Sequence, residues 1–311
     1  MEAKLGTPVV RPGSVSRVPL VNRLRASRTS SVVTVSAPAG YGKTTLLAQW
    51  SDRDERPFAW VSLDEGDNDA LAFTRYVAAS LAGVRHVDGA VFDALRTRRS
   101  LSTHGIARLA SALRSSPYPV VLVLDDVQVL RSRECVKAVA ALAQHVPDGS
   151  TLVLSGRTLP RLPFARLRAM GRLFALDRRD LELGGRDTER LLNAIGVSPS
   201  PAELAALSEW TEGWAAGTYL AALALKARPA GDRGEAFRDD PFVEDYFELE
   251  HLSRLEPEDV RFLTRSSVLD RLSAPSCDAV LERDDSARRL DSLARANVFL
   301  VPLDQQRSAY R

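Results

Sequence analysis

The stretch from Ser36 to Trp50, SAPAGYGKTTLLAQW, has the residue types of a loop that binds nucleotide phosphates. In such loops a lysine reaches the β- and γ-phosphates, and the hydroxyl that follows it is a ligand of Mg²⁺. Here these two residues are Lys43 and Thr44. Gly40 and Gly42 permit the tight backbone path that turns N–H groups toward phosphate oxygens. The apolar run before the loop and the helical pattern after it are the context that the motif requires.

The first glycine of this pattern is missing, because Ala37 stands five residues before Gly42. Alanine is adequate there if the position needs a small side chain and not a positive φ. The alternative is a glycine-rich turn with a chance Gly-Lys-Thr and no ligand. We expect a working loop. Its expected nucleotide-binding residues are Pro38, Ala39, Gly40, Tyr41, Gly42, Lys43, Thr44 and Thr45.

A pair of acids, Asp125 and Asp126, ends the apolar run PVVLVLDDV at 119–127. An apolar strand that delivers an acid at its C-terminal end is the second half of a P-loop nucleotide-hydrolysing site. We expect Asp125 to hold Mg²⁺ through its water shell and Asp126 to orient or activate the attacking water. The alternative is an Asp-Asp turn without such a role.

Arg157 ends another apolar run, TLVLSGR. An arginine at the C-terminal edge of a strand, beside both groups, can sense the γ-phosphate or stabilise charge in the transition state. In an arginine-rich chain the alternative is a solvated strand end. The expected catalytic residues are therefore Lys43, Asp126 and Arg157, and the expected metal ligands are Thr44 and Asp125.

Four apolar runs predict buried strands, at 31–38, 57–64, 119–127 and 149–157. Helical spacing of apolar residues predicts intervening helices at about 43–52, 70–83 and 104–115. A further helix and strand are expected where arginines and apolar residues interleave, over 161–179. Strands that alternate with helices predict an α/β fold with a doubly wound parallel sheet.

The pattern after residue 183 is helical, with one more strand expected at 298–303. A polar segment with Pro and Gly at 228–241 has the composition of a linker. The expected organisation is an N-terminal arm at 1–30, a nucleotide-binding domain at 31–182, a helical domain with its linker at 183–240, and a last domain at 241–311.

Composition limits the other function classes. The net charge of +2 does not indicate binding to nucleic acid or to acidic membranes. The arginines of 161–179 are expected on a solvated face. The two cysteines and four histidines are scattered, so a zinc site or a disulfide framework is not expected. No apolar run reaches the roughly 18 residues of a membrane span and no signal pattern opens the chain, so we expect a cytoplasmic protein.

Six motifs occur in the same order as in one family, and from about residue 4 to 310 the chain resembles MalT-like regulators. These are STAND-class ATPases, or large ATP-binding LuxR-type transcriptional regulators. The motifs are SAPAGYGKTTLLAQW, AWVSLDEGDND, LVLDDVQVL, RLPFARLRAMGRLFAL, TEGWAAGTYLAALAL and FLTRSSVLDRLSAPSCDAV. The resemblance implies a P-loop domain, a helical domain and a winged-helix-like domain that clamp ADP at rest. It also implies an inducer that exchanges ADP for ATP, self-association of the protein, and slow hydrolysis that resets the switch.

The resemblance adds three residue-level expectations. Arg17 is expected near the adenine and ribose, and the segment GWAAG is expected to approach the nucleotide from the helical domain. Ala215 in that segment replaces a proline of many relatives, and Gly156 replaces a more common serine. Alanine is ordinary in the family at the position of Ala37.

Members of this family continue into a helical-repeat sensor and a DNA-binding helix-turn-helix. The sequence ends at Arg311, so we expect an isolated switch module that lacks those domains and does not bind DNA directly. The expected ligands are ATP or ADP with Mg²⁺, and the expected function is a nucleotide switch with weak ATPase activity in transcription regulation. The alternatives are a non-hydrolysing, nucleotide-bound interaction module and, less favoured, a P-loop phosphotransferase.

Overall fold

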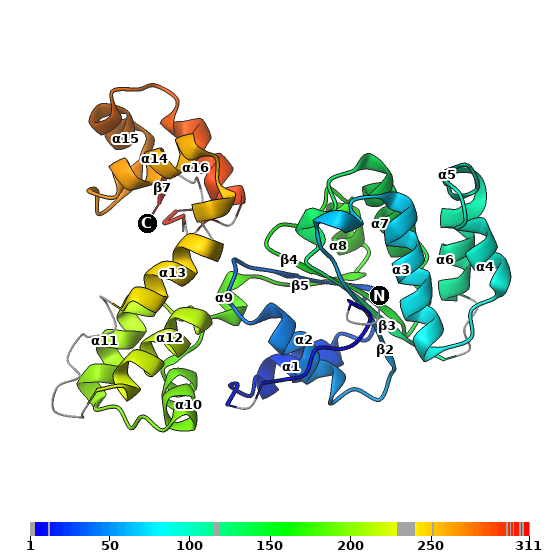
Figure 1. The fold of residues 1–311 in the computed structure, drawn as a ribbon, viewed down its shortest axis with the longest axis horizontal. Helices are drawn as coiled ribbons and strands as arrows, with labels where there is room; N and C mark the ends of the chain where they lie inside the picture. Colours follow the sequence, from blue (N-terminus) through cyan, green and yellow to red (C-terminus); the bar gives the residue numbers. More distant parts are fainter. Residues whose placement is uncertain are drawn as a thin grey trace. The chain divides into compact units, whose positions relative to one another are not determined.

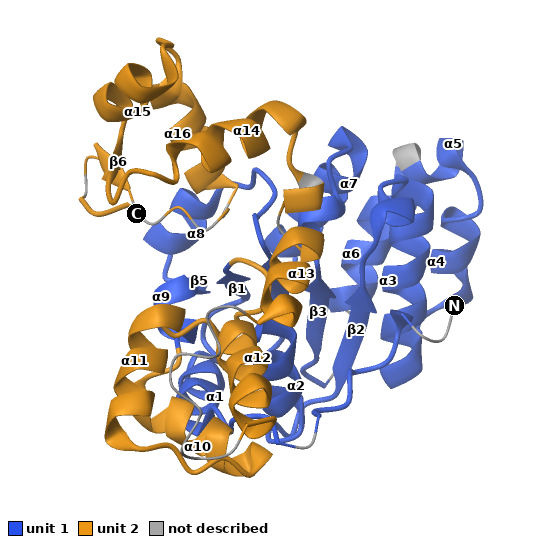
Figure 2. Ribbon diagram, turned by 60° about the vertical axis from the view of Figure 1, so that its left-hand side comes forward, with its two compact units in different colours: residues 1–37, 42–182 blue, residues 38–41, 183–311 orange. Residues whose placement is uncertain are grey.

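The computed structural model describes residues 4–11, 13–114, 118–228, 240–250, 252–296, 298, 300, 302–304, 306 and 308–310. These residues form two compact units. The first consists of residues 1–37 and 42–182, and the second of residues 38–41 and 183–311 (Figure 2). Most of the expected linker at 228–241 lies outside the described residues.

The first unit is built on a five-stranded sheet in which every pair of neighbouring strands is parallel. The strands are β1 (Val32–Ser36), β2 (Phe58–Ser62), β3 (Val121–Asp125), β4 (Thr151–Gly156) and β5 (Leu173–Leu176), in the spatial order β2-β3-β4-β1-β5. The central strands β3 and β4 are buried at every residue because helices cover both faces of the sheet. The expected α/β fold with a doubly wound parallel sheet is confirmed.

Figure 1 shows the helices of this unit on two sides of the sheet. One side carries α1 (Val18–Ala26) and α2 (Lys43–Ser51). The other carries α3 (Ala70–Val84), α4 (Gly89–Ala94), α6 (Ile106–Arg114) and α7 (Arg133–Gln144). The short helices α5 (Arg98–Ser100), α8 (Phe164–Ala169) and α9 (Arg178–Leu181) complete the unit. The expected helix at 104–115 begins in a π-helical turn at Leu101–Gly105 and continues as α6.

Local sequence explains several of these boundaries. Asp69 precedes α3 in an extended conformation and accepts hydrogen bonds from the N–H groups of Leu71 and Ala72, as a helix N-cap does. Ser132 caps α7 in the same way by accepting from the N–H of Cys135. One apolar core then joins the sheet to α3, α6 and α7 through side chains such as Phe73.

The second unit contains two helical clusters. The first consists of α10 (Gly185–Ile195), α11 (Pro201–Thr211) and α12 (Ala215–Lys226), which share a core that includes Leu192, Leu207 and Leu225. The second consists of α14 (Pro257–Ser266), α15 (Ala274–Leu281) and α16 (Ser286–Arg295), packed around Phe262 and Leu290. The helix α13 (Pro241–Glu250) lies between these clusters in sequence.

The second cluster also contains a small antiparallel sheet of β6 (Leu272–Ser273) and β7 (Ala309–Tyr310). Sequence periodicity did not predict β6, because a strand of two residues is too short to show alternation. The strand expected at 298–303 falls partly on residues 299 and 301, which lie outside the described residues. Among its described residues, Pro302 forms an isolated bridge with Tyr310.

Candidate nucleotide-binding site

The loop between β1 and α2 has the backbone that a phosphate-binding loop needs. Gly40 and Gly42 have φ angles of 77° and 75°, values that side chains other than glycine rarely adopt. Ala37 is buried and is not among the residues with positive φ. This position therefore does not require the positive φ that would demand glycine, which is the condition under which alanine was expected to be adequate.

Lys43 is the first residue of α2, and its side chain contacts the start of the loop. Its Nζ donates a hydrogen bond of 2.9 Å to the carbonyl oxygen of Ala37, and the residue is only 8% exposed. The ammonium group thus lies within the loop, at a helix N-terminus whose N–H groups and dipole favour an anion.

Thr44 and Asp125 come together although they are far apart in sequence. The Thr44 hydroxyl donates to Oδ2 of Asp125 over 2.6 Å, and Asp125 stands at the end of β3 with 2% of its surface exposed. Burial raises the pKa of the Asp125 carboxyl, and the charge of Asp126 adds to this rise. The hydrogen bond from Thr44 and the charge of Lys43 act in the opposite direction.

This pair fits Mg²⁺. The metal prefers oxygen ligands, keeps several waters and commonly takes only one or two protein groups in addition to substrate phosphates. A hydroxyl oxygen and a carboxylate oxygen in contact supply that set. A neighbouring cation also favours the charged form of a carboxylate that burial has removed from water.

Asp126, Gln128 and Arg157 form a second group at the same edge of the sheet. Asp126 has a φ of 61°, in the left-handed region. Gln128 Nε2 donates to Oδ1 of Asp126 over 2.9 Å, and Gln128 Oε1 accepts from the backbone N–H of Arg157 over 2.9 Å. Two of the three expected catalytic residues, Asp126 and Arg157, are therefore joined through a residue that the sequence did not single out as part of the site.

Arg17 makes contacts that were not expected. Its guanidinium donates to the carbonyl oxygens of Asp180, Leu181 and Glu182, at 3.1, 2.9 and 3.2 Å. These carbonyls lie at the end of α9, where a helix leaves backbone oxygens without helical partners. Its backbone N–H donates to Gln49 Oε1 over 2.7 Å. Arg17 therefore joins the N-terminal arm to α2 and α9, and its expected place near adenine stays a prediction.

Within the second unit, residues 38–41 of the loop are held by the segment GWAAG. The indole Nε1 of Trp214 donates to the carbonyl oxygen of Ala39 over 3.0 Å. The backbone N–H of Ala216 donates to the carbonyl oxygen of Gly40 over 2.9 Å. A Cβ on Gly40 would lie 2.5 Å from Trp214 Nε1 and 2.6 Å from the Ala216 Cβ. Gly40 is thus required by close approach as well as by its φ.

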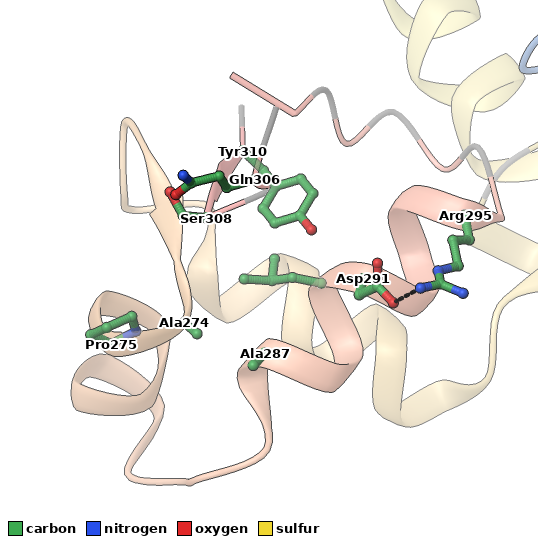
Figure 3. Close-up of a pocket in the computed structure, with 9 residues that line it drawn as sticks. Ala274, Pro275, Ala287, Asp291, Arg295, Gln306, Ser308 and Tyr310 are labelled. Atoms are coloured by element: carbon green, nitrogen blue, oxygen red, sulfur yellow. Dashed lines mark ion pairs between the residues drawn. The ribbon is translucent and has the colours of Figure 1, made fainter. Parts of the chain in front are cut away.

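A hollow of about 900 Å³ occurs in the second cluster of the second unit (Figure 3). It is lined by the start of α15, one face of α16 and residues near β7, and none of residues 36–45 lines it. Asp291 and Arg295 at its edge form an ion pair of 2.8 Å with each other. We assign no chemistry to this hollow.

Two further observations limit the other kinds of site in the part of the chain that the structure describes. No helix there is long and apolar enough to cross a membrane. No group of three or more His, Cys, Asp or Glu side chains is arranged to hold a metal ion among those same residues.

The fold and the loop define a P-loop ATPase of the α/β class, and comparison with known proteins agrees. Residues 25–159 match the family model described as an AAA domain, and residues 248–311 match the MalT winged helix domain. The Walker-type ATPase PABY2304 of Pyrococcus abyssi has the same fold, with a TM-score of 0.65 at 14% identity over 97% of this chain and 96% of that one.

Two curated relatives carry the comparison over nearly the whole chain. Both are described as the HTH-type transcriptional regulator MalT. The protein of Serratia proteamaculans is 30% identical over 97% of this chain and 34% of its own length. The protein of Klebsiella pneumoniae is 27% identical over 99% of this chain and 35% of its own length. The chain is therefore a MalT-like ATPase region, and it spans about a third of the length of these relatives.

Proposed function

We propose that this chain binds ATP and ADP with Mg²⁺ and acts as a nucleotide-dependent switch, with weak ATPase activity that resets it. The observation that carries the proposal is the contact of the Thr44 hydroxyl with the buried Asp125 carboxylate beside a loop with positive φ at Gly40 and Gly42. This contact supports the proposal because a loop of this shape suits phosphates and an acid beside it suits the accompanying cation.

Each site residue has a proposed part in this function. The N–H groups of the loop and of the α2 N-terminus bind the phosphates, and Lys43 adds a charge at the β- and γ-phosphates. Thr44 and Asp125 would hold Mg²⁺, which when bound neutralises charge on the phosphate oxygens. Arg157 would stabilise negative charge at the γ-phosphate.

Hydrolysis in this proposal is an in-line displacement by water. The oxygen of water bonds to the γ-phosphorus while the bond to the bridging oxygen of ADP breaks. Asp126 orients that water and accepts its proton, which then passes to solvent. Because Asp126 follows Asp125 directly in sequence, one strand end would present both the metal ligand and the base.

The wider role is proposed from the relatives. Because both are described as transcriptional regulators, we propose that the nucleotide state of this region serves transcription regulation through inducer-dependent self-association. We propose no direct DNA contact and no membrane contact by this region.

The first test measures the bound nucleotide of the purified protein and its rate of ATP hydrolysis. We expect the purified protein to release ADP on denaturation and to hydrolyse ATP slowly. The variant Asp126→Ala should lose turnover by about 100-fold or more, as removal of a positioned base does, while the exposed Asp148→Asn should not. Absence of any adenine nucleotide, with no affinity for added ADP, would contradict the proposal. Tightly retained ADP with no turnover in either protein would instead favour the non-hydrolysing interaction module.

A further inference from the structure

We infer that Gln128 is a positioning residue for hydrolysis, which holds the carboxylate of Asp126 and the backbone of Arg157 in one arrangement. This inference rests on the proposed ATPase function and deepens it. It concerns the chemical step and not the binding of nucleotide, because Gln128 lies beside the expected catalytic residues and outside the phosphate loop.

The contacts of Gln128 use both ends of its amide. It lies in the 3₁₀ turn at Val127–Val129 that follows β3. Its NH₂ group donates to Oδ1 of Asp126 over 2.9 Å, and its carbonyl oxygen accepts from the N–H of Arg157 over 2.9 Å. Among side chains of this length, only an amide donates and accepts at once. A glutamate would lose the donor, and a leucine would lose both groups.

Gly156 lies directly against the Gln128 amide. A Cβ on Gly156 would lie 2.5 Å from Gln128 Oε1 and 3.1 Å from the Thr158 carbonyl oxygen. Any larger residue at 156 would therefore displace the amide or the backbone that follows it. Glycine at position 156 thus has a physical reason in this chain, since it admits the Gln128 side chain.

The backbone of Asp126 shows why its side chain needs to be held. A residue with φ of 61° that is not glycine is strained, and such strain persists where neighbouring contacts fix it. Two contacts do so here, because the Asp126 N–H donates to Asp125 Oδ1 over 3.1 Å and Oδ1 of Asp126 accepts from Gln128. Fixing one carboxylate oxygen also fixes the direction of the other.

The consequence is a linkage between two strand ends. Asp126 follows β3, and Arg157 follows β4, which is the neighbour of β3 in the sheet. Gln128 spans the two ends, so one side chain contacts both the carboxylate of the proposed base and the backbone of the arginine. A reaction rate falls steeply when a catalytic group is displaced by about 1 Å. Hydrolysis is the step that requires Asp126 and Arg157 together.

The test separates turnover from binding in the full chain. We expect Gln128→Leu and the isosteric Gln128→Glu to keep the dissociation constant of ADP within about 2-fold and to lower ATP turnover by about 10-fold or more. The matched control is Gln144→Leu, at an exposed position on α7. Gly156→Ala should lower turnover in the native background and lower it less in the Gln128→Ala background, because the closest contact, with the amide, is absent there.

The outcomes distinguish this inference from the proposed function. If the native protein binds no nucleotide, the proposed function fails and the inference with it. If the native protein binds and hydrolyses ATP while Gln128→Leu and Gln128→Glu turn over at the native rate, the inference alone is overturned. It is also overturned if both variants lose ADP affinity in parallel with turnover, or if the native protein binds ADP and does not hydrolyse ATP.

Discussion

At the scale of single residues, the main feature of the site is a carboxyl group that is buried away from water. The Asp125 carboxylate is 2% exposed, and the Thr44 hydroxyl donates to it over 2.6 Å. Hydrogen bonds of this kind compensate a buried charge only in part, so the charged form of Asp125 is disfavoured until a cation adds to the site. In the proposed Mg²⁺ site, metal binding and proton loss would therefore be linked at this residue.

This linkage predicts a pH dependence of stability. Because the pKa of Asp125 is raised in the folded protein, the folded state holds its proton more tightly than the unfolded state does. The contribution of Asp125 to stability is therefore lost as pH rises from the ordinary aspartate pKa through the raised one. We expect the nucleotide-free protein with Asp125→Asn to have a higher melting temperature than the native protein at pH 8, with a smaller difference at pH 4.

The same variant should lose the Mg²⁺ dependence of ATP binding, since an amide is a poor magnesium ligand. Asp148→Asn, at an exposed position, serves as the control in both measurements. A melting temperature of Asp125→Asn that is equal to or below the native value at pH 8, in the absence of nucleotide, would contradict this account of the buried carboxylate.

Site residues could be predicted from the sequence where they belong to a short motif or end a strand. They could not be predicted where their role depends on how distant segments pack in the fold. Lys43, Thr44 and Asp125 were predicted from motif and strand ends, and the structure brings Thr44 and Asp125 together. Gln128 was missed because its role needs the left-handed turn at Asp126 and the adjacency of β3 and β4. The one available signal was a polar residue within the apolar run VQVL.

At the scale of elements, the loop from Ser36 to Lys43 joins a buried strand to a helix and is shaped by two glycines. Their requirements differ. Gly42 precedes α2, and a Cβ added to it would meet nothing within 4 Å, so only its φ of 75° demands glycine. Gly40 has both a positive φ and close neighbours in Trp214 and Ala216.

These differences predict an unequal effect of the same substitution. Gly42→Ala should lower the free energy of unfolding by roughly 1–2 kcal/mol, the cost of a left-handed conformation for an alanine. Gly40→Ala should lower it by a further 1–3 kcal/mol or so, because overpacking against Trp214 adds to the strain. Denaturant unfolding of the two variants measures the difference, with Gly83→Ala in α3 as the control, since a Cβ there meets nothing within 4 Å. Equal losses at Gly40 and Gly42 would contradict the contact with Trp214.

The elements themselves were predictable where their pattern is strong. The mainly apolar runs of β1 to β4 do not alternate with polar residues because the sheet is covered on both faces, and all four strands were expected. The helices α4 and α7 were not among the expected elements. α4 has only six residues, which is too short to show a helical period, whereas α7 follows the Asp-Asp turn after a Ser132 cap that was not recognised as a helix start.

At the scale of the whole molecule, the phosphate loop is divided between the two compact units. Residues 38–41 belong with 183–311, and residues 42–45 belong with the α/β unit. Residues 38–41 belong with the second unit because they contact the segment GWAAG, through the hydrogen bonds that Trp214 and Ala216 donate to the carbonyl oxygens of Ala39 and Gly40.

The central claim is that the loop of Gly40 to Thr45 binds adenine nucleotide through Lys43, and calorimetric titration of ADP tests it most directly. Lys43→Ala removes a charged phosphate partner worth about 3 kcal/mol, so the dissociation constant should rise by about 100-fold or more. Lys137→Ala, at an exposed position on α7, controls for loss of one lysine and should bind like the native protein. An ADP affinity of Lys43→Ala equal to that of the native protein would contradict the phosphate-loop assignment.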